Sequence, residues 1–196
     1  KIVFLTGTRA DYGKLKPLIT ATKKNKKFHL IIVITGMHLK KKYGSTYTQI
    51  EKDFSNTDIY KIYNYNKNDN MDIVLAKTIK YFGQTIKKIS PDLVVIHGDR
   101  VETLAATIHC NLNNVLTCHI EGGEVSGTVD ESIRHATTKL SHIHFVSNLK
   151  AKNILKRMGE VDKNIYIIGS PEVDIMIGKN LPSQCDVNKR YDVKYR

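Results

Sequence analysis

Residues 115–140 read VLTCHIEGGEVSGTVDESIRHATTKL, and this segment is the strongest indication of the fold class. Its first six residues predict a buried strand, and Asp130–Leu140 is predicted to form a helix after a glycine-rich loop. On that helix Glu131, Arg134 and His135 are spaced i, i+3 and i+4, which places them on one face. A strand that leads through a short loop into a helix is the repeating unit of open α/β sheets. Such sheets bind ligands at the carboxyl ends of their strands.

The same unit recurs along the chain. Apolar runs predict strands over Lys1–Thr6, Phe28–Thr35, Ile59–Tyr63, Leu93–His97, Val115–Ile120, Ile143–Val146 and Ile165–Ile168. Helices are predicted over Asp11–Lys24, Tyr47–Asp53, Asn70–Ile89, Arg100–Leu112, Asp130–Leu140, Asn148–Met158 (with Ser147 as N-cap) and Pro171–Ile177. The fold class is therefore α/β, a three-layer Rossmann-like parallel sheet with helices on both faces. We expect one domain over residues 1–180 and a polar interdomain linker over residues 181–196.

Composition narrows the classes of function. The 196 residues carry a formal net charge of +12, but the lysines are spread and no aromatic residues interleave the basic clusters. This pattern predicts a solvated surface that attracts an anionic small substrate, and no nucleic acid partner. No apolar run reaches the roughly 18 residues of a membrane span, so we expect no membrane association. Cys110, Cys118 and Cys185 match no zinc spacing, so no metal is expected. A free thiol in the buried strand at Cys118 indicates a reducing, cytoplasmic setting.

The first strand ends in GTRADYGK (7–14). A glycine at this point permits a tight turn, and the helix N-terminus that follows favours an anion. Arg9 and Lys14 add two positive charges, so we predict that both bind an anionic group of a substrate. The spacing is neither GxGxxG nor GxxxxGK[ST], which argues against the usual dinucleotide and nucleoside triphosphate loops. The structural alternative is a turn glycine followed by a surface arginine.

Other strand ends carry further candidates. His38 follows the second predicted strand, Asp99 and Arg100 follow the fourth, and Glu121 directly follows the fifth. Ser170 lies in a Gly-Ser-Pro turn after the last strand. The structural alternatives are a hydrogen-bonded histidine, an N-capping aspartate and a salt-bridged glutamate. Because parallel strands end at one edge of the sheet, these residues together predict an acid/base site beside an anion site.

Five blocks of sequence make a family recognisable. They are GTRADYGKLKPL (7–18), TGMHL (35–39), HGDRVE (97–102), HIEGGEVSGTVDESIRHATTKLSH (119–142) and GSP-x-x-D (169–174). They run in order through nearly the whole chain, and the fourth is long and specific. On these blocks the chain resembles the hydrolysing UDP-N-acetylglucosamine 2-epimerases of sialic acid and related nonulosonate pathways.

The resemblance implies one of two Rossmann-like domains that face each other across a cleft, as in GT-B glycosyltransferases. It implies an elimination without a cofactor, in which the sugar nucleotide loses its nucleoside diphosphate and its C2 proton. Water then adds to the 2-acetamidoglucal to give N-acetylmannosamine. By the match, Asp99, Glu121 and Glu131 are the expected catalytic carboxylates. The expected substrate-binding residues are Arg9, Lys14, His38, Arg100, Arg134, His135 and Ser170.

The chain ends about where the family's second domain would begin. We therefore expect the N-terminal half alone, without the C-terminal nucleotide-binding domain, and little or no turnover by the isolated chain. A homodimer is expected from the family. A GT-B glycosyltransferase half, a non-hydrolysing 2-epimerase and a non-enzymatic nucleotide-sugar-binding domain remain as alternatives. The nucleotide (UDP or GDP) and a 4-acetamido-4,6-dideoxy form of the sugar are also left open.

Overall fold

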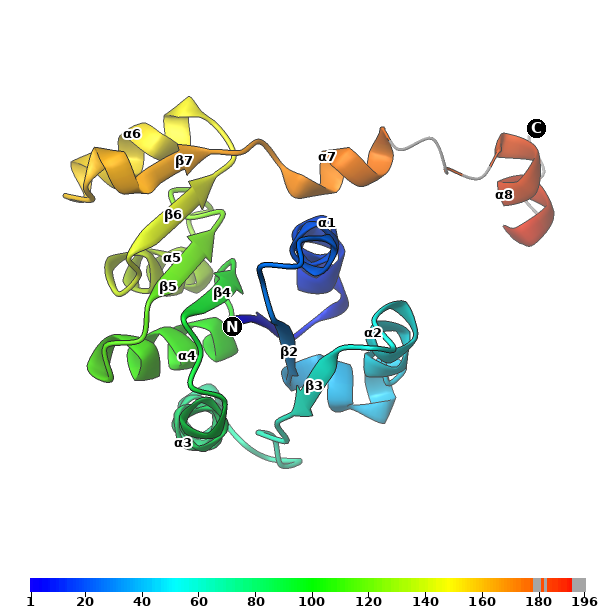
Figure 1. The fold of residues 1–196 in the computed structure, drawn as a ribbon, viewed down its shortest axis with the longest axis horizontal. Helices are drawn as coiled ribbons and strands as arrows, with labels where there is room; N and C mark the ends of the chain where they lie inside the picture. The colour runs from blue at the N-terminus through cyan, green and yellow to red at the C-terminus, as the bar shows by residue number, and fades with distance from the viewer. Residues whose placement is uncertain (178–180, 182, 192–196) are drawn as a thin grey trace.

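A single sheet of seven parallel strands forms the centre of the computed structural model, which describes residues 1–177, 181 and 183–191 (Figure 1). The strands are β1 (Ile2–Thr6), β2 (Leu30–Ile34), β3 (Asp58–Lys61), β4 (Leu93–His97), β5 (Thr117–Ile120), β6 (Ile143–Val146) and β7 (Ile165–Ile167). Their order is β3-β2-β1-β4-β5-β6-β7, and every pairing is parallel. The order reverses between β1 and β4, which makes the carboxyl ends of these two strands the expected ligand crevice.

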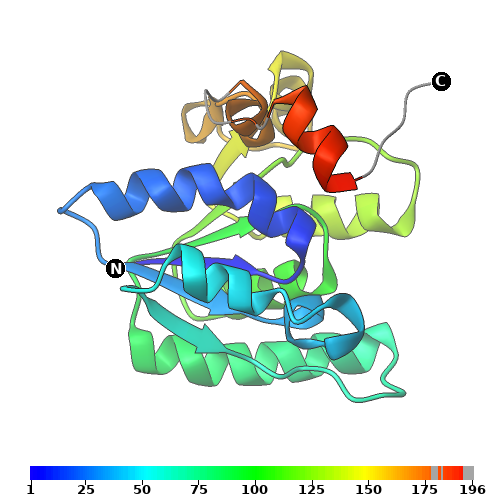
Figure 2. The same ribbon diagram turned by 90° about the vertical axis from the view of Figure 1, so that its right-hand side faces the viewer.

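Helices cover both faces of this sheet, as predicted for the α/β class (Figures 1 and 2). They are α1 (Arg9–Lys24), α2 (Tyr47–Asp53), α3 (Met71–Ile89), α4 (Val101–Leu112), α5 (Val129–Lys139), α6 (Leu149–Arg157), α7 (Pro171–Met176) and α8 (Gln184–Tyr191). Helices α1 and α2 lie on one face, and α3, α4 and α5 lie on the other. Helix α7 returns to pack against α1, so the last part of the fold reaches back to its first helix.

Alternate residues of each strand enter opposite core layers, because strand side chains point to the two faces in turn. In β1, Val3 packs in the layer with Phe82 of α3, whereas Phe4 packs in the layer with Leu15 of α1. Val3, Phe82 and Leu15 are fully buried. Each large apolar side chain buried in this way stabilises the fold by about 1.5–3 kcal/mol. These two layers fix the sheet and so fix the positions of its carboxyl ends.

The sequence predictions needed a few local corrections. Asn148, not Ser147, caps α6, because its Oδ1 accepts the amide of Ala151 at 2.9 Å. The Ser147 hydroxyl donates instead to Glu124 on the loop after β5. The third strand begins at Asp58, one residue earlier than predicted, because its register pairs that residue with Ile31 of β2.

Part of the predicted linker is helical. Residues 184–191 form α8, and the rest of the predicted linker lies largely outside the described residues. Ser183 and Asp186 begin this helix reciprocally: the amide of Asp186 donates to the Ser183 hydroxyl, and the amide of Ser183 donates to the Asp186 carboxylate. This is a capping box, a Ser-x-x-Asp signal that was present in the sequence. Among the described residues, no helix has the length and apolarity to span a membrane.

Candidate active site

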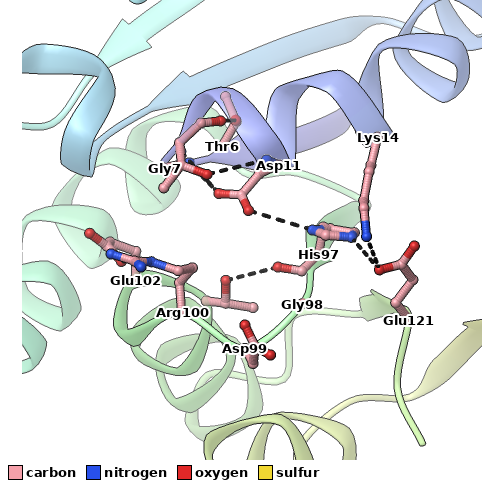
Figure 3. Close-up of polar contacts among 12 residues, drawn as sticks. Thr6, Gly7, Asp11, Lys14, His97, Gly98, Asp99, Arg100, Glu102 and Glu121 are labelled. Atoms are coloured by element: carbon pink, nitrogen blue, oxygen red, sulfur yellow. Dashed lines mark hydrogen bonds and ion pairs between the residues drawn. The ribbon is translucent and has the colours of Figure 1, made fainter. Parts of the chain in front are cut away.

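A buried histidine lies between two carboxylates at the switch point of the sheet (Figure 3). His97 ends β4, Glu121 follows β5, and Asp11 and Lys14 come from the first turns of α1. His97 Nε2 is 3.0 Å from Glu121 Oε2, and His97 Nδ1 is 3.6 Å from Asp11 Oδ1. Lys14 Nζ donates to the same Glu121 oxygen at 2.7 Å. Four charged groups from three elements therefore meet at the carboxyl ends of β1, β4 and β5.

The charges in this cluster stabilise one another. Burial alone lowers the pKa of His97, but the carboxylates of Asp11 and Glu121 outweigh it and raise that pKa to about 9. Burial raises the pKa of Glu121, yet His97 and Lys14 lower it to about 2. The pKa of Lys14 is raised, because the attraction of Glu121 exceeds the cost of burying its ammonium group. At neutral pH the cluster thus holds an imidazolium, an ammonium and two ionised carboxylates.

Asp11 is placed by the local structure of the first helix. Thr8 caps α1: its hydroxyl accepts the Asp11 amide at 3.2 Å, and Asp11 Oδ2 accepts the amides of Thr8 (3.0 Å) and Gly7 (3.3 Å). This capping box leaves Oδ1 to face His97. Burial raises the pKa of Asp11, but His97, Thr8 and Gly7 together hold it below its ordinary value. The capping box at the start of α1 therefore also holds the Asp11 carboxylate in place beside His97.

Glu121 has an unusual backbone conformation. Its φ is +62°, a left-handed value that non-glycine residues adopt rarely and at a cost of roughly 1–3 kcal/mol. The other described non-glycine residues with positive φ are Ser45, Ser90 and Asn114, all small polar residues. Such strain in a long, charged residue at a ligand crevice is typical of functional sites.

Helix α5 organises a second group of predicted residues. Arg134 forms an ion pair with Asp99 and also donates to the Glu124 carbonyl at 2.8 Å. Glu131 accepts the amides of Ser126 (2.7 Å) and Gly127 (2.6 Å) and therefore supports the loop that precedes its helix. His135 Nε2 lies 3.7 Å from Glu131.

Arg100 is placed by a buried carboxylate that the sequence predictions did not include. Its Nε is 3.8 Å from Oε2 of Glu102, which is 1% exposed, and Tyr65 donates to Glu102 Oε1 at 2.7 Å. A Cβ at Gly36 would lie 2.6 Å from the same Oε1, so only glycine fits there. Tyr65 also lines a cavity of about 680 Å³ with Lys40, Lys41, Lys42 and Lys67, which makes this flank of the site strongly basic.

The remaining predicted residues differ in how accessible they are. Arg9 lines a cavity of about 440 Å³ and has no ion-pair partner within the described ranges. His38 is fully buried, with Nε2 2.9 Å from Thr6 Oγ1 and Nδ1 2.6 Å from Thr46 Oγ1, so the structure gives it a bracing position. The Ser170 hydroxyl lies 3.4 Å from Glu172. The part of the chain that the structure describes contains no group of His, Cys, Asp and Glu side chains arranged to hold a metal ion.

Comparison with known proteins places the chain in a family. The family profile for UDP-N-acetylglucosamine 2-epimerase matches residues 20–195. The chain belongs to this family. A UDP-N-acetylglucosamine 2-epimerase of Neisseria meningitidis serogroup B is 45% identical over the whole chain, which covers 52% of that protein. The UDP-N,N'-diacetylbacillosamine 2-epimerase (hydrolyzing) of Legionella pneumophila is 38% identical over 97% of the chain and 51% of its own length.

Solved structures of this epimerase family share the fold. A crystal structure of UDP-GlcNAc 2-epimerase from Neisseria meningitidis bound to UDP-GlcNAc superposes with a TM-score of 0.80 at 22% identity. The match covers 90% of this chain and 48% of that one. The chain therefore has the Rossmann-like fold of the N-terminal half of a GT-B enzyme, and it spans about half the length of the curated relatives it matches.

Three residues of the site, Asp11, His97 and Glu102, are not among the site residues predicted from the sequence. His97 and Asp11 lay inside recognised blocks, and Glu102 ended one of them. The Thr-x-x-Asp spacing at residues 8–11 signalled the capping box of α1. No local signal showed that His97 faces Asp11 and Glu121, because the three residues are brought together only by the packing of α1 against the sheet.

Proposed function

We propose that the chain forms the N-terminal half of a hydrolysing UDP-N-acetylglucosamine 2-epimerase. The observation that carries the proposal is the charged cluster at the switch point, where His97 and Lys14 hold Glu121 ionised in a strained backbone conformation. Asp99 lies at the end of the neighbouring strand β4 and is held by Arg134. Two oriented carboxylates on adjacent strand ends suit a reaction that needs proton transfer next to a developing positive charge.

The chemistry explains why such a site would be needed. The C2 proton of the sugar becomes acidic only as C1 gains oxocarbenium character, so loss of the diphosphate and loss of the proton must be assisted together. In the proposed first step one of the catalytic carboxylates takes the C2 proton, the C–H electron pair forms the C1=C2 bond, and the C1–O bond breaks so that its electron pair leaves with the diphosphate. In the second step water adds its hydroxyl to C1, and C2 receives a proton on the face opposite to the one that lost its proton, which inverts the configuration at C2. The products are N-acetylmannosamine and UDP.

The roles of individual residues follow the charges. Arg9 and Lys14, near the N-terminus of α1, would stabilise the departing diphosphate. Asp99, Glu121 and Glu131 remain the proposed catalytic carboxylates. Burial raises the pKa of Glu121, but His97 and Lys14 lower it to about 2 and so hold this carboxylate ionised. Arg100, whose Nε faces Glu102, stays a proposed substrate contact.

The hydrolysing type is supported by the Legionella pneumophila relative, a hydrolyzing UDP-N,N'-diacetylbacillosamine 2-epimerase whose similarity extends over 97% of the chain. The long block at residues 119–142 also supports the hydrolysing type, because it resembles the corresponding block of the hydrolysing enzymes. From the family resemblance we also propose a role in nonulosonate biosynthesis and a homodimeric assembly. A nucleotide-sugar substrate is supported by the solved epimerase of Neisseria meningitidis, which is bound to UDP-GlcNAc. The basic flank of the site agrees with an anionic substrate.

The test is proton NMR of the complete enzyme, this chain together with a C-terminal half, incubated with UDP-N-acetylglucosamine in deuterated water. Free N-acetylmannosamine with deuterium at C2 is the expected product. Release of UDP-N-acetylmannosamine without free sugar would identify a non-hydrolysing enzyme, and transfer that requires an acceptor would identify a glycosyltransferase. The 196-residue chain alone is expected to show little or no turnover in the same assay.

A further inference from the structure

His119 is a buried histidine with no assigned role, and both of its ring nitrogens are hydrogen-bonded. It is fully buried on β5, two residues before Glu121. Its Nε2 lies 2.8 Å from the carbonyl oxygen of Gly98, and its Nδ1 lies 3.1 Å from Oγ1 of Thr138 on α5. Because a carbonyl oxygen can only accept, Nε2 carries the proton. In a neutral ring Nδ1 is then an acceptor, so the Thr138 hydroxyl donates to it.

The carbonyl that His119 holds belongs to the turn that presents Asp99. Gly98 has a left-handed φ of +75°, which turns the chain sharply between the end of β4 and Asp99. The Gly98 amide donates to the Ile120 carbonyl at 3.0 Å, while its own carbonyl accepts from His119. Strand β5 therefore binds this turn through hydrogen bonds to both the amide and the carbonyl of Gly98.

Helix α5 reaches the same turn at two points. Arg134 and Thr138 are four residues apart and lie on one face of the helix. Arg134 binds the Asp99 carboxylate directly, and Thr138 acts through His119 on the peptide before it. The packing has no spare room: a Cβ added at Gly122 would lie 2.8 Å from Thr138 Oγ1 and 3.1 Å from His119 Nδ1. The strand that ends before Glu121 and the turn that carries Asp99 are thus joined by one side chain.

We propose that His119 is a positioning residue for the epimerase reaction: as a neutral ring protonated at Nε2, it fixes the Gly98–Asp99 turn relative to Glu121. This inference rests on the proposed function, because it assigns the positioned carboxylates to that reaction. His119 has no exposed surface. Burial lowers its pKa to about 3, which keeps the ring neutral throughout the working range of pH.

Two amide variants separate positioning from general support. In His119→Gln the side-chain amide can still reach the Gly98 carbonyl as a donor, whereas in His119→Asn it is too short to do so. In the complete enzyme His119→Asn is expected to lower kcat on the order of tenfold to a hundredfold with KM within about threefold of wild type. His119→Gln is expected to recover most of that loss. His29→Asn, a change at an exposed histidine, is the control for surface effects.

A second measurement does not depend on activity. In the 196-residue chain, ¹⁵N NMR is expected to show His119 protonated at Nε2 only, unchanged from pH 5 to 9. The amide resonances of Gly98 and Asp99 should move in His119→Asn and stay near wild type in His119→Gln. Equal losses of kcat in both variants, a titrating ring or unmoved Asp99 resonances in His119→Asn would overturn the proposal. If the wild-type enzyme turns over no UDP-N-acetylglucosamine while these resonances behave as expected, the proposed function fails and the positioning of Asp99 stands.

Discussion

The free energy of unfolding of the wild-type chain should fall as the pH rises toward 9, and replacing His97 by glutamine should remove the part of this fall that His97 causes. In the wild-type chain the neighbouring carboxylates raise the pKa of His97 from 6.5 to about 9. A histidine whose pKa is higher in the folded than in the unfolded state stabilises the fold only while it is protonated in the folded state. Its contribution is fully present below pH 6.5 and is lost as the pH rises through about 9. Glutamine cannot titrate, so the variant lacks this contribution at every pH.

The size of the effect follows from the same two values. One unit of pKa corresponds to about 1.4 kcal/mol, so the difference between 6.5 and about 9 corresponds to roughly 3 kcal/mol. We therefore expect the difference in unfolding free energy between wild type and His97→Gln to shrink by roughly 3 kcal/mol between pH 6.5 and 9. Comparing the two proteins at each pH cancels the contributions of the groups that do not interact with His97.

The assay is urea denaturation of the 196-residue chain at intervals of half a pH unit, followed by far-ultraviolet circular dichroism. His29→Gln serves as the matched control, because this histidine pairs with Asp58 on the surface, where it is about half exposed. An NMR titration of the wild-type chain should place the His97 midpoint near pH 9. A stability difference that stays constant within about 1 kcal/mol from pH 6.5 to 9 would refute the reasoning.

Further outcomes are expected at other positions. Gly36→Ala places a Cβ 2.6 Å from a buried carboxylate oxygen, whereas Gly44→Ala, at a residue whose φ is also positive, places it in open space. Urea denaturation should show that Gly36→Ala lowers the free energy of unfolding by about 1–3 kcal/mol more than Gly44→Ala. Glu121→Gln in the complete enzyme should lower kcat by about 10²–10⁴-fold while the fold is retained. Glu172 is the half-exposed second partner of Lys14, and kcat of Glu172→Gln should stay near that of wild type. Burial lowers the pKa of His38 to about 4, so wild-type stability should fall as the pH drops from 6.5 toward 4, and His38→Asn should flatten that part of the curve.

The predicted strands and helices were confirmed, mostly to within one or two residues, because their signals are local. Near-continuous apolar runs such as LIIVI marked parallel core strands, and the long amphipathic spacing of α3 marked its helix. The errors were also local in origin. At α6 two adjacent capping residues competed, and Asn148 has the geometry that Ser147 lacks. At α8 a capping box begins a helix in a segment whose polar composition predicts a linker.

The candidate site was only partly readable from the sequence. The sequence predicts Asp99 and Glu121 because they follow strand ends, and Lys14 because it adds a positive charge near the start of the first helix. All three lie at the carboxyl edge of the sheet (Figure 3). Their partners were not predicted. The structural alternative for Asp99 was a helix N-cap. In the structure Arg100 occupies the N-cap position of α4, and Asp99 pairs with Arg134 of α5. That pair joins residues 35 positions apart, which no local pattern specifies.

By itself the sequence determined the fold class, the edge of the sheet that carries the chemistry and, through long contiguous blocks, the epimerase family. These properties follow from hydrophobic period and from residues that are neighbours in the chain. Only the tertiary structure decided which charges meet. Asp11 comes from helix α1, His97 ends strand β4 and Glu121 follows strand β5. Their ionisation depends on distances and burial that arise when α1 packs on the sheet. Electrostatic energy depends on separation in space and on exclusion of water, and neither is fixed by position in the chain.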